Sequence, residues 1–314
     1  MKFTGLVTFL LAGISTSLIA APFAYVPNEG SGTISIIDTQ TDAVTGEIAI
    51  GGKPRGIAIS PDGKRLYVSE QKGEHVDVID TANKKFIKKI PVGDSPEAVY
   101  VNQDGTLIAV ANEEANTVSL IDAKALKIKS TIKLSGKNPE HAVFSPDGKL
   151  IFASAEEADK VDVVSVGKKK QIAQIDVGLR PRGIAFTPDG KKAFVASELV
   201  DTLYAIDVQT LKVTGKVKTG VRINGVTMHP SGKTVFVTNG GDANVSFVDT
   251  ETLEIKANVP VGKRPWNMAI TADGKKLYVA AGRSDAVSVI DTETAKTIKE
   301  IAVGKLPWGV VIGK

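Results

Sequence analysis

Arginine, glutamate and tryptophan side chains recur at one position of a repeated sequence pattern, and these residue types can bind an anion, transfer a proton or cover an apolar ring. The position follows a marker proline, or an isoleucine in one copy, and its occupants are Arg55, Glu97, Glu140, Arg182, Asn224, Trp266 and Trp308. In one copy the next residue is His141, where most copies have glycine or alanine. Because the rest of the repeat is more uniform, we predict that these eight residues carry the function.

The arginines at this position could hold a carboxylate or phosphate through two N–H donors of one guanidinium, which lysine could not do. A competing interpretation is that Arg55 and Arg182 pair with Glu97 and Glu140 across a central channel. Two further arginines are close in sequence, at Arg180 and Arg222.

The aromatic and histidine residues also allow two interpretations each. Trp266 and Trp308 are the only two tryptophans of the chain, and they could form a flat wall for a planar or apolar group or fill an interface between units. His141 could serve in acid–base chemistry, or it could fill the channel with a satisfied hydrogen bond. It should enter a space that the other copies leave empty. His75 and His229 fall in different loops, so a three-histidine metal site is not expected.

The elements that position these residues follow from a turn that returns every 42 or 43 residues. Its glycine, in Asp-Gly or Ser-Gly, is found at Gly63, Gly105, Gly148, Gly190, Gly232 and Gly274. A period in this range is typical of a propeller blade. Each copy holds four runs rich in Val, Ile, Phe and Tyr, as at residues 97–101, 107–112, 117–122 and 128–134. Seven marker positions therefore predict an all-β, seven-bladed propeller with four antiparallel strands per blade.

Turn residues support this assignment. In Ser60-Pro61-Asp62-Gly63 the proline presets φ at the first corner and the glycine accepts a left-handed conformation at the last, which favours a tight hairpin. In most blades an aspartate near the end of the third strand can accept a hydrogen bond from a backbone N–H group two residues later in the chain. Only the third blade lacks this aspartate, having Ser165 instead.

The two ends of the chain complement each other. Residues 308–312 match the first strand of a blade, whereas residues 25–50 match strands two to four of a blade without a first strand. We therefore expect residues 25–314 to form one domain whose N-terminal strands pair with its C-terminal strand. Such closure removes two exposed strand edges, so trimming either end should open the ring.

The first residues lie outside the repeat. Met1 and Lys2 precede an apolar stretch at about residues 6–19, and small residues follow at Ala20, Ala21 and Ala24. This pattern predicts a signal peptide over residues 1–20, cleaved between about 20 and 24, and a periplasmic or secreted protein. A membrane anchor is the alternative, but the stretch is shorter than the roughly 20 residues that a spanning helix needs.

Composition excludes several classes. The chain has no cysteine, so disulfides, a lipid-modified cysteine, thiolate metal sites and covalent haem are excluded. A formal net charge of +4 is too small to indicate nucleic-acid binding. Loops between strands two and three are acidic, whereas the Asp-Gly hairpins at the other face are rich in lysine, so we predict a charge dipole along the ring axis that could orient a partner.

The repeat motif resembles that of the YVTN family of β-propeller repeats. The resemblance is carried by Tyr25-Val26-Pro27-Asn28, Tyr67-Val68-Ser69 and Phe236-Val237-Thr238-Asn239. Together with export and the segment from Gly51 to Val68, the chain is similar to periplasmic propellers associated with PQQ-dependent alcohol catabolism. The resemblance implies a periplasmic partner, either a quinoprotein dehydrogenase or an associated transport component, and a contact with PQQ. It does not imply a molecular role.

Three functions from different classes fit the sequence. The main hypothesis is a non-catalytic binding or scaffold protein, presumed monomeric, because no nucleophile, base and orienting group recur together and no cofactor or metal motif is seen. The alternative is a lactone hydrolase or lyase that uses arginine, glutamate and histidine at the channel mouth. The third is a carrier of a non-covalent redox cofactor.

Overall fold

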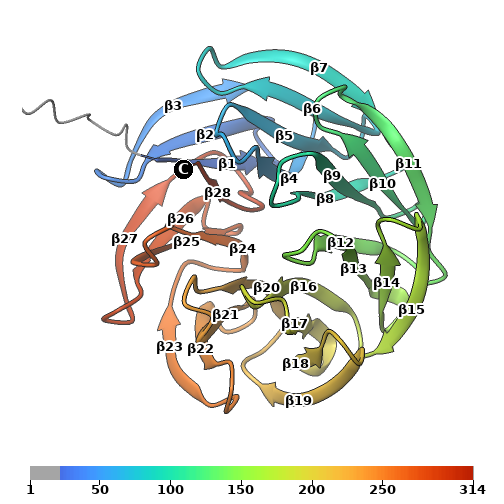
Figure 1. Cartoon of the computed structure of the whole chain (residues 1–314). Coiled ribbons are helices and arrows are strands. Elements are labelled where there is room, and N and C mark those ends of the chain that lie inside the picture. The colour runs from blue at the N-terminus through green and yellow to red at the C-terminus, as the bar shows by residue number, and fades with distance from the viewer. Residues whose placement is uncertain (1–21, 314) are drawn as a thin grey trace, which may run out of the picture.

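Seven four-stranded antiparallel sheets form a ring around a central channel in the computed structural model, which describes residues 22–313 (Figure 1). The sequence prediction of a seven-bladed, all-β propeller is confirmed. Blades 1 to 6 follow the chain, and the closing blade joins its two ends. The first strand of each blade lies next to the channel and the fourth lies at the rim (Figure 1).

The inner two strands of blades 1 to 6 are β4 (Pro54–Ile59) and β5 (Arg65–Glu70), β8 (Pro96–Val101) and β9 (Leu107–Asn112), β12 (Pro139–Phe144) and β13 (Leu150–Ala155), β16 (Pro181–Phe186) and β17 (Lys192–Ser197), β20 (Ile223–Met228) and β21 (Thr234–Asn239), and β24 (Pro265–Ile270) and β25 (Lys276–Ala281). The outer two are β6 (His75–Asp80) and β7 (Lys85–Pro91), β10 (Thr117–Asp122) and β11 (Lys127–Lys133), β14 (Lys160–Ser165) and β15 (Lys170–Asp176), β18 (Thr202–Asp207) and β19 (Lys212–Lys218), β22 (Asn244–Asp249) and β23 (Ile255–Pro260), and β26 (Ala286–Asp291) and β27 (Lys296–Ala302). In blade 2 these bounds differ from the predicted ones by one residue at most.

The closing blade has the order β28-β1-β2-β3, with β28 (Val311–Ile312), β1 (Phe23–Asn28), β2 (Thr33–Asp38) and β3 (Ala43–Ala49). Ala24 pairs with Ile312, and the Trp308 amide donates to the Pro27 carbonyl at 3.0 Å. The predicted pairing of the two ends is therefore confirmed. β1 begins two residues before the repeat pattern indicated, while the predicted signal peptide, residues 1–20, lies outside the described residues.

The Asp-Gly hairpins have the predicted geometry. Gly63 has φ of 71°, and its amide donates to the Ser60 carbonyl at 2.8 Å. The aspartates that end the third strands accept backbone N–H bonds, as Asp38 does from Gln40 at 2.8 Å. Ser165 takes the same role in blade 3, where its hydroxyl accepts from the Lys168 amide at 3.3 Å. Blade 3 therefore replaces the missing aspartate without losing the turn.

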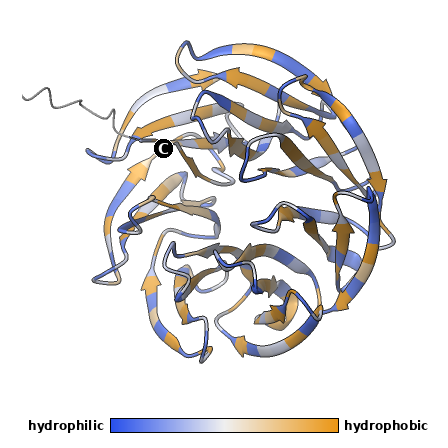
Figure 2. Cartoon of the chain, in the orientation of Figure 1, coloured by the Kyte–Doolittle hydropathy of each residue, from blue (hydrophilic) through white to orange (hydrophobic). Residues whose placement is uncertain are grey.

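Hydrophobic residues are concentrated in the strands, whereas the connecting loops are mostly hydrophilic (Figure 2). Buried apolar clusters join residues of adjacent blades. The loops before the first strands and the loops after the second strands share one face, because backbone bonds join them. The Glu113 amide donates to the Ser95 carbonyl at 2.9 Å, and the Glu198 amide donates to the Arg180 carbonyl at 2.9 Å. This face carries the site described below, and the Asp-Gly hairpins form the opposite face.

Candidate functional site

A polar cavity of about 360 Å³ lies at the channel end on the face of the shared loops, and we call it the mouth. Its lining comes from blades 1 to 6 and from the closing blade. The lining residues are Glu29, Arg55, Gln71, Glu113, Glu140, Glu156, Arg180, Arg182, Asn224, Arg264, Trp266 and Trp308. The mouth thus contains six of the eight predicted residues, Arg55, Glu140, Arg182, Asn224, Trp266 and Trp308, while Glu97 and His141 lie buried outside its lining.

Arg55 and Glu97 form an ion pair between adjacent blades. Arg55 Nη1 lies 2.5 Å from Glu97 Oε1, and Gln71 Nε2 donates to the same oxygen at 3.0 Å. The Glu97 side chain is fully buried and its second oxygen has no hydrogen-bond partner. Burial, reinforced by the nearby charge of Glu140, raises the pKa of Glu97 well above its usual value.

Arg182 is held by three carboxylates. Its Nη1 lies 2.7 Å from Glu140 and 2.9 Å from Glu156, and its Nε lies 3.0 Å from Glu198. The interpretation in which the arginines pair with glutamates is confirmed for both Arg55 and Arg182. The pairs join neighbouring blades, not opposite sides of the channel.

Glu198 is the centre of an arginine cluster. Its fully buried carboxylate also accepts from Arg264 at 2.8 Å and from Arg222 at 3.2 Å, and Arg180 Nε lies 3.6 Å away. Burial by itself would raise the pKa of Glu198, but the guanidinium groups of Arg182, Arg264 and Arg180 lower it to about 2. One carboxylate therefore holds four like charges together.

Glu198→Gln should destabilise the fold by about 3–5 kcal/mol, because it removes a fully buried carboxylate that contacts four arginines. Chemical denaturation near pH 7 would measure the loss. Since the folded-state pKa of Glu198 is depressed, its contribution is present above the usual glutamate pKa and is lost as the pH falls toward 2. The exposed Glu254, which pairs with Lys256, provides a control: Glu254→Gln should change stability by less than about 1 kcal/mol. Equal effects of the two variants would contradict this account.

Glu140 and Glu156 form a carboxylate pair on either side of Arg182. Burial raises the pKa of Glu156 to about 7, with the charge of Glu140 adding to the effect and Arg182 opposing it. Burial would also raise the pKa of Glu140. Arg182, with a smaller effect of Arg55, instead lowers this pKa below its usual value. Two adjacent carboxyl groups whose pKa values are pushed apart are the arrangement that acid–base catalysis uses.

Glu113 completes a group of three carboxylates. Within residues 22–313, oxygen atoms of Glu113, Glu140 and Glu156 all lie within 4.8 Å of one another. This spacing would suit a cation, but Arg182 already contacts Glu140 and Glu156, and Arg180 Nε bonds to Glu156. Guanidinium groups therefore supply the positive charge at this point.

The two tryptophans have different surroundings. Trp266 lies against Gly282: a Cβ atom added at Gly282 would come within 2.2 Å of the Trp266 ring. Likewise, a Cβ atom added at Gly240, in the preceding blade, would lie 3.0 Å from Arg264 Nη1. Other blades have glutamate or glutamine at this position, so glycine makes room for the two large side chains that enter the mouth.

Gly282→Ala should displace the Trp266 ring, because the added methyl group overlaps it. We expect a loss of about 1–3 kcal/mol in stability and a shift in Trp266 emission, measured in a Trp308→Phe background. Gly167→Ala is the matched control, since a Cβ there meets no atom within 4 Å. Emission unchanged by Gly282→Ala would show that Trp266 does not pack on this glycine.

Trp308 lines the mouth and packs on His141, which lies outside the lining. The two rings stack at 6.0 Å between centroids with an interplanar angle of 21°. His141 Nδ1 lies 2.7 Å from the Tyr100 hydroxyl, whereas its buried Nε2 has no partner. Burial lowers the pKa of His141 to about 4, so the imidazole is neutral at pH 7. The sequence interpretation gave His141 a satisfied hydrogen bond inside the channel. This holds for Nδ1 and not for Nε2.

The expectation that His141 enters a space left empty elsewhere is wrong. At Gly56 an added Cβ would lie 2.3 Å from the Glu97 carbonyl oxygen, and at Gly183 it would lie 2.6 Å from that of Asn224. Backbone of the next blade fills the space in these copies. The other histidines have separate neighbours: His75 Nε2 is 3.1 Å from Asp77, and His229 Nδ1 is 2.8 Å from Ser231 Oγ.

Sequence reasoning missed Glu156, Glu198 and Arg264 as site residues. Glu156 and Glu198 begin two short 3₁₀ turns, η1 (Glu156–Ala158) and η2 (Glu198–Val200), directly after the second strands of blades 3 and 4. The sequence placed both glutamates only among the acidic loops between strands two and three. The signal was their shared position after the second strand, which is occupied in turn by Glu29, Gln71, Glu113, Glu156, Glu198, Gly240 and Gly282.

The predicted charge dipole is weaker than the loop sequences indicate. At the mouth, Glu29 lies 3.4 Å from Arg55, and the carboxylates of Glu156 and Glu198 pair with arginines. At the hairpin face, Asp62 accepts from the Lys64 amide, and its charge offsets part of the lysine charge. Opposite charges therefore meet on both faces.

A seven-bladed propeller with a charged, arginine-rich mouth is the class of protein that this fold and site define. The chain belongs to the family described as lactonase, 7-bladed beta-propeller, whose model matches residues 141–302. A second model, YNCE-like beta-propeller, matches residues 17–106. The assignment to β-propeller repeats is thus confirmed, whereas the resemblance to the YVTN family and the link to PQQ-dependent alcohol oxidation stay predictions.

Solved structures share the fold at low sequence identity. Hydrazine synthase of Kuenenia stuttgartiensis is 24% identical, with a TM-score of 0.77 over 91% of this chain and 99% of that chain. A protein of Desulfotomaculum acetoxidans reaches a TM-score of 0.83 at 20% identity, over 93% and 99%. The periplasmic gluconolactonase PpgL of Pseudomonas aeruginosa has a TM-score of 0.79 at 19% identity, also over 93% and 99%. Proteins of different function therefore share this scaffold.

A curated relative matches only a short segment. The PE-PGRS family protein PE_PGRS18 of Mycobacterium tuberculosis is 54% identical over 37 residues, which is 12% of this chain and 8% of that protein. The match has the length of about one blade. Within residues 22–313, no helix is long and apolar enough to cross a bilayer.

Proposed function

We propose that the protein hydrolyses a lactone bound in the mouth, with Glu156 as general base. The observation that carries the proposal is the carboxylate pair: Glu156, with a pKa of about 7, lies beside an ionised Glu140, and Arg182 contacts both. A base whose pKa is close to the working pH is the most effective at removing a proton from water. Family membership and the likeness to a gluconolactonase support the same reaction class.

The reaction would proceed in two steps. Glu156 removes a proton from a water molecule as its oxygen attacks the lactone carbonyl carbon, giving a tetrahedral oxyanion. The bond between the acyl carbon and the ring oxygen then breaks, and the proton on Glu156 passes to the departing alkoxide. The product is a hydroxy acid, and Glu156 returns to its starting state.

Other residues of the mouth would bind and orient the substrate. The arginines Arg182, Arg180 and Arg264 line the cavity and would stabilise the oxyanion or an anionic substituent. Trp266 and Trp308 provide flat walls for the face of a sugar-like ring. His141, neutral and outside the lining, would support Trp308 without touching the substrate.

The direct test is hydrolysis of D-glucono-1,5-lactone and its 6-phosphate, followed by titration of the acid released. We expect turnover above the spontaneous rate. Comparing the two lactones tests whether the four arginines of the mouth, which also contact carboxylates, bind a phosphate group. Absence of turnover on both, and on a broader panel of five- and six-membered lactones, would reject the hydrolase and favour the binding function that the sequence first suggested.

We further propose that the protein acts outside the cytoplasm. The apolar N-terminal stretch and the likeness to a periplasmic enzyme support export. Docking to a quinoprotein or an associated transport component, a contact with PQQ and a monomeric state stay predictions.

A further inference from the structure

Asn224 lines the mouth, but the proposed hydrolysis gives it no task. It lies on β20 of blade 5 and is 6% exposed. Five asparagines are buried within residues 22–313, and side-chain hydrogen bonds to the protein hold four of them, Asn28, Asn102, Asn112 and Asn239. The Asn224 amide makes no such bond to any residue in that range, and neither of its polar atoms is sealed in the interior. Since buried polar groups are nearly always hydrogen-bonded, this amide is available to a ligand of the mouth.

A β-bulge fixes the position of Asn224. The pairing of β20 with β21 passes over Asn224 and Gly225, which together lie opposite Thr238. The Thr238 hydroxyl accepts from the Gly225 amide at 2.7 Å and donates to the Trp266 carbonyl at 2.8 Å. Bulges commonly redirect a side chain next to a functional site, and here one hydroxyl also ties the bulge to the backbone of Trp266 in the next blade.

Two different side chains flank Asn224 in the ring. Arg182 precedes it in blade 4 and Trp266 follows it in blade 6, and both line the mouth. The backbones of the three blades are in close contact here. A Cβ atom added at Gly183 would lie 2.6 Å from the Asn224 carbonyl oxygen, and one added at Gly225 would overlap the Trp266 carbonyl oxygen. Asn224 is therefore held between a blade that provides a guanidinium and a blade that provides a flat aromatic wall.

The Asn224 amide differs from the other polar groups of the mouth in its hydrogen-bonding capacity. Arginine and indole N–H groups only donate, and an ionised carboxylate only accepts. The nitrogen of Gln71 is already engaged, since it donates to Ser95 Oγ at 3.2 Å and to Glu97 Oε1 at 3.0 Å. Asn224 offers a donor and an acceptor side by side, and a hydroxyl group, which also does both, matches this pattern. The charged arginines stay the stronger partners for a carbonyl oxygen or an oxyanion.

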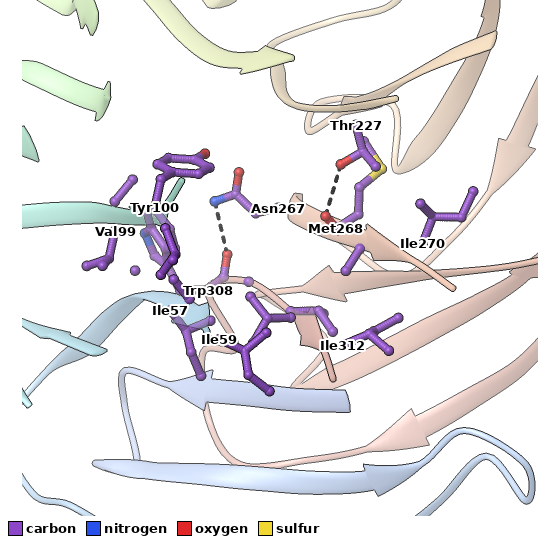
Figure 3. A pocket seen from close by; sticks show the side chains of 18 of the residues that line it. Ile57, Ile59, Val99, Tyr100, Thr227, Asn267, Met268, Ile270, Trp308 and Ile312 are labelled. Atoms are coloured by element: carbon purple, nitrogen blue, oxygen red, sulfur yellow. Dashed lines mark hydrogen bonds between the residues drawn. The ribbon is translucent and has the colours of Figure 1, made fainter. Parts of the chain in front are cut away.

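The channel below the mouth provides a contrast. Trp308 lines both the mouth and a second cavity of about 350 Å³ that the first strands surround (Figure 3). In this cavity Asn267 Nδ2 donates to the Trp308 carbonyl at 3.4 Å, and the Thr227 hydroxyl donates to the Met268 carbonyl at 3.0 Å (Figure 3). The fold thus supplies backbone partners for these two polar side chains, whereas it supplies none for Asn224 within the described residues.

We propose that Asn224 binds a ring hydroxyl group of the lactone and thereby sets the specificity for hydroxylated over unsubstituted lactones. The face of the ring lies on Trp266, and the edge of the ring, which carries the hydroxyl groups, meets the Asn224 amide. A site that bonds a substrate hydroxyl rejects the analogue without it, because the amide is then left unpaired. The inference rests on the proposed function, since it takes a lactone as the ligand of the mouth.

The test compares D-glucono-1,5-lactone with δ-valerolactone, a six-membered lactone without hydroxyl groups, in the parent protein, Asn224→Leu and Asn224→Ala. Both substitutions should lower kcat/KM for the glucono-lactone about 5- to 100-fold, the effect of removing one partner of a buried hydrogen bond. For δ-valerolactone kcat/KM should change less than about threefold, because that ring has no hydroxyl group to lose a partner. An equal loss on both lactones would place Asn224 at the reacting carbonyl and overturn the assignment. Parent rates on both lactones in both folded variants would overturn it as well.

Asn102→Leu is the matched control. Asn102 is 5% exposed, but it lies in a hairpin at the opposite face, where its side chain bonds to Thr106 and Leu107. This variant should lose stability without changing the ratio of the two kcat/KM values. Circular dichroism shows that each variant is folded. A ratio that shifts in Asn102→Leu as it does in Asn224→Leu would trace the effect to general destabilisation and reject the inference.

A binding experiment separates this inference from the hydrolase. Titration with 1,5-anhydro-D-glucitol, a ring polyol without the lactone carbonyl, should change tryptophan emission saturably in the parent, and Asn224→Leu should weaken this binding about 5- to 100-fold. Such binding without turnover of any lactone would reject the hydrolase and retain Asn224 as the residue that recognises a ring hydroxyl. Turnover whose substrate ratio does not depend on Asn224 would retain the hydrolase and reject the inference, and absence of both binding and turnover would reject both.

Discussion

Replacing Glu156 by glutamine should lower kcat for lactone hydrolysis about 10²–10⁴-fold, because the amide cannot accept a proton from water. In the unchanged protein, kcat/KM should rise with pH through about 7 and then level off, since the carboxylate form of Glu156 is the active base and its pKa is about 7. Glu156→Gln should remove this dependence. Initial rates between pH 5 and 8.5, corrected for spontaneous hydrolysis, measure both effects.

Glu157→Gln is the matched control for that experiment. Glu157 is adjacent in sequence but exposed, so its substitution should leave the rate and the pH profile unchanged. Product binding by Glu156→Gln, measured by calorimetry with gluconate, would show that the mouth is intact. If Glu156→Gln binds gluconate and retains the parent rate, Glu156 is not the base.

Deleting residues 307–314 should prevent the ring from closing. The deletion removes β28, the bond from Trp308 to Pro27 and the buried side chains of Trp308 and Val310. Loss of a buried tryptophan side chain alone costs about 3–5 kcal/mol, and β1 becomes an exposed edge. We expect a loss above about 5 kcal/mol, together with aggregation, measured by denaturant unfolding and light scattering.

A point variant distinguishes the strand from its side chain. Trp308→Ala retains the backbone pairing, so it should lose about 3–5 kcal/mol, less than the deletion loses. It should also stay monodisperse if the deletion aggregates because of its open edge. Cooperative unfolding of the deletion variant at the parent midpoint would show that the ring does not depend on this closure.

The fold could be predicted from the sequence because its signals are local and repeated. Pro61 and Gly63 define a hairpin by backbone geometry alone, and the same geometry returns in each blade. The pairing of residues 24–28 with residues 307–312 was also predictable, since a blade without a first strand and a first strand without a blade must complement each other.

The site was predictable only in part. The position after the marker proline identified Arg55, Glu140 and Arg182, because aligned copies place these residues around one axis. Glu156 and Glu198 were misplaced, since their burial depends on arginines from neighbouring blades that the repeat pattern does not align with them. The role of Gly282 could not be predicted, because it depends on a three-dimensional contact with the Trp266 ring, which leaves no room for a Cβ atom.

The contact of Arg182 and Arg180 with Glu156 makes ligand binding and proton binding interdependent. These guanidinium groups oppose the effect of burial on the pKa of Glu156. An anion that binds to the same arginines competes for them, so Glu156 then holds its proton more tightly and the complex takes up protons from a neutral buffer. An anionic product would therefore leave the base protonated, and its departure would return a proton to the solvent, which makes the hydroxy acid an inhibitor whose potency increases as the solution becomes more acidic.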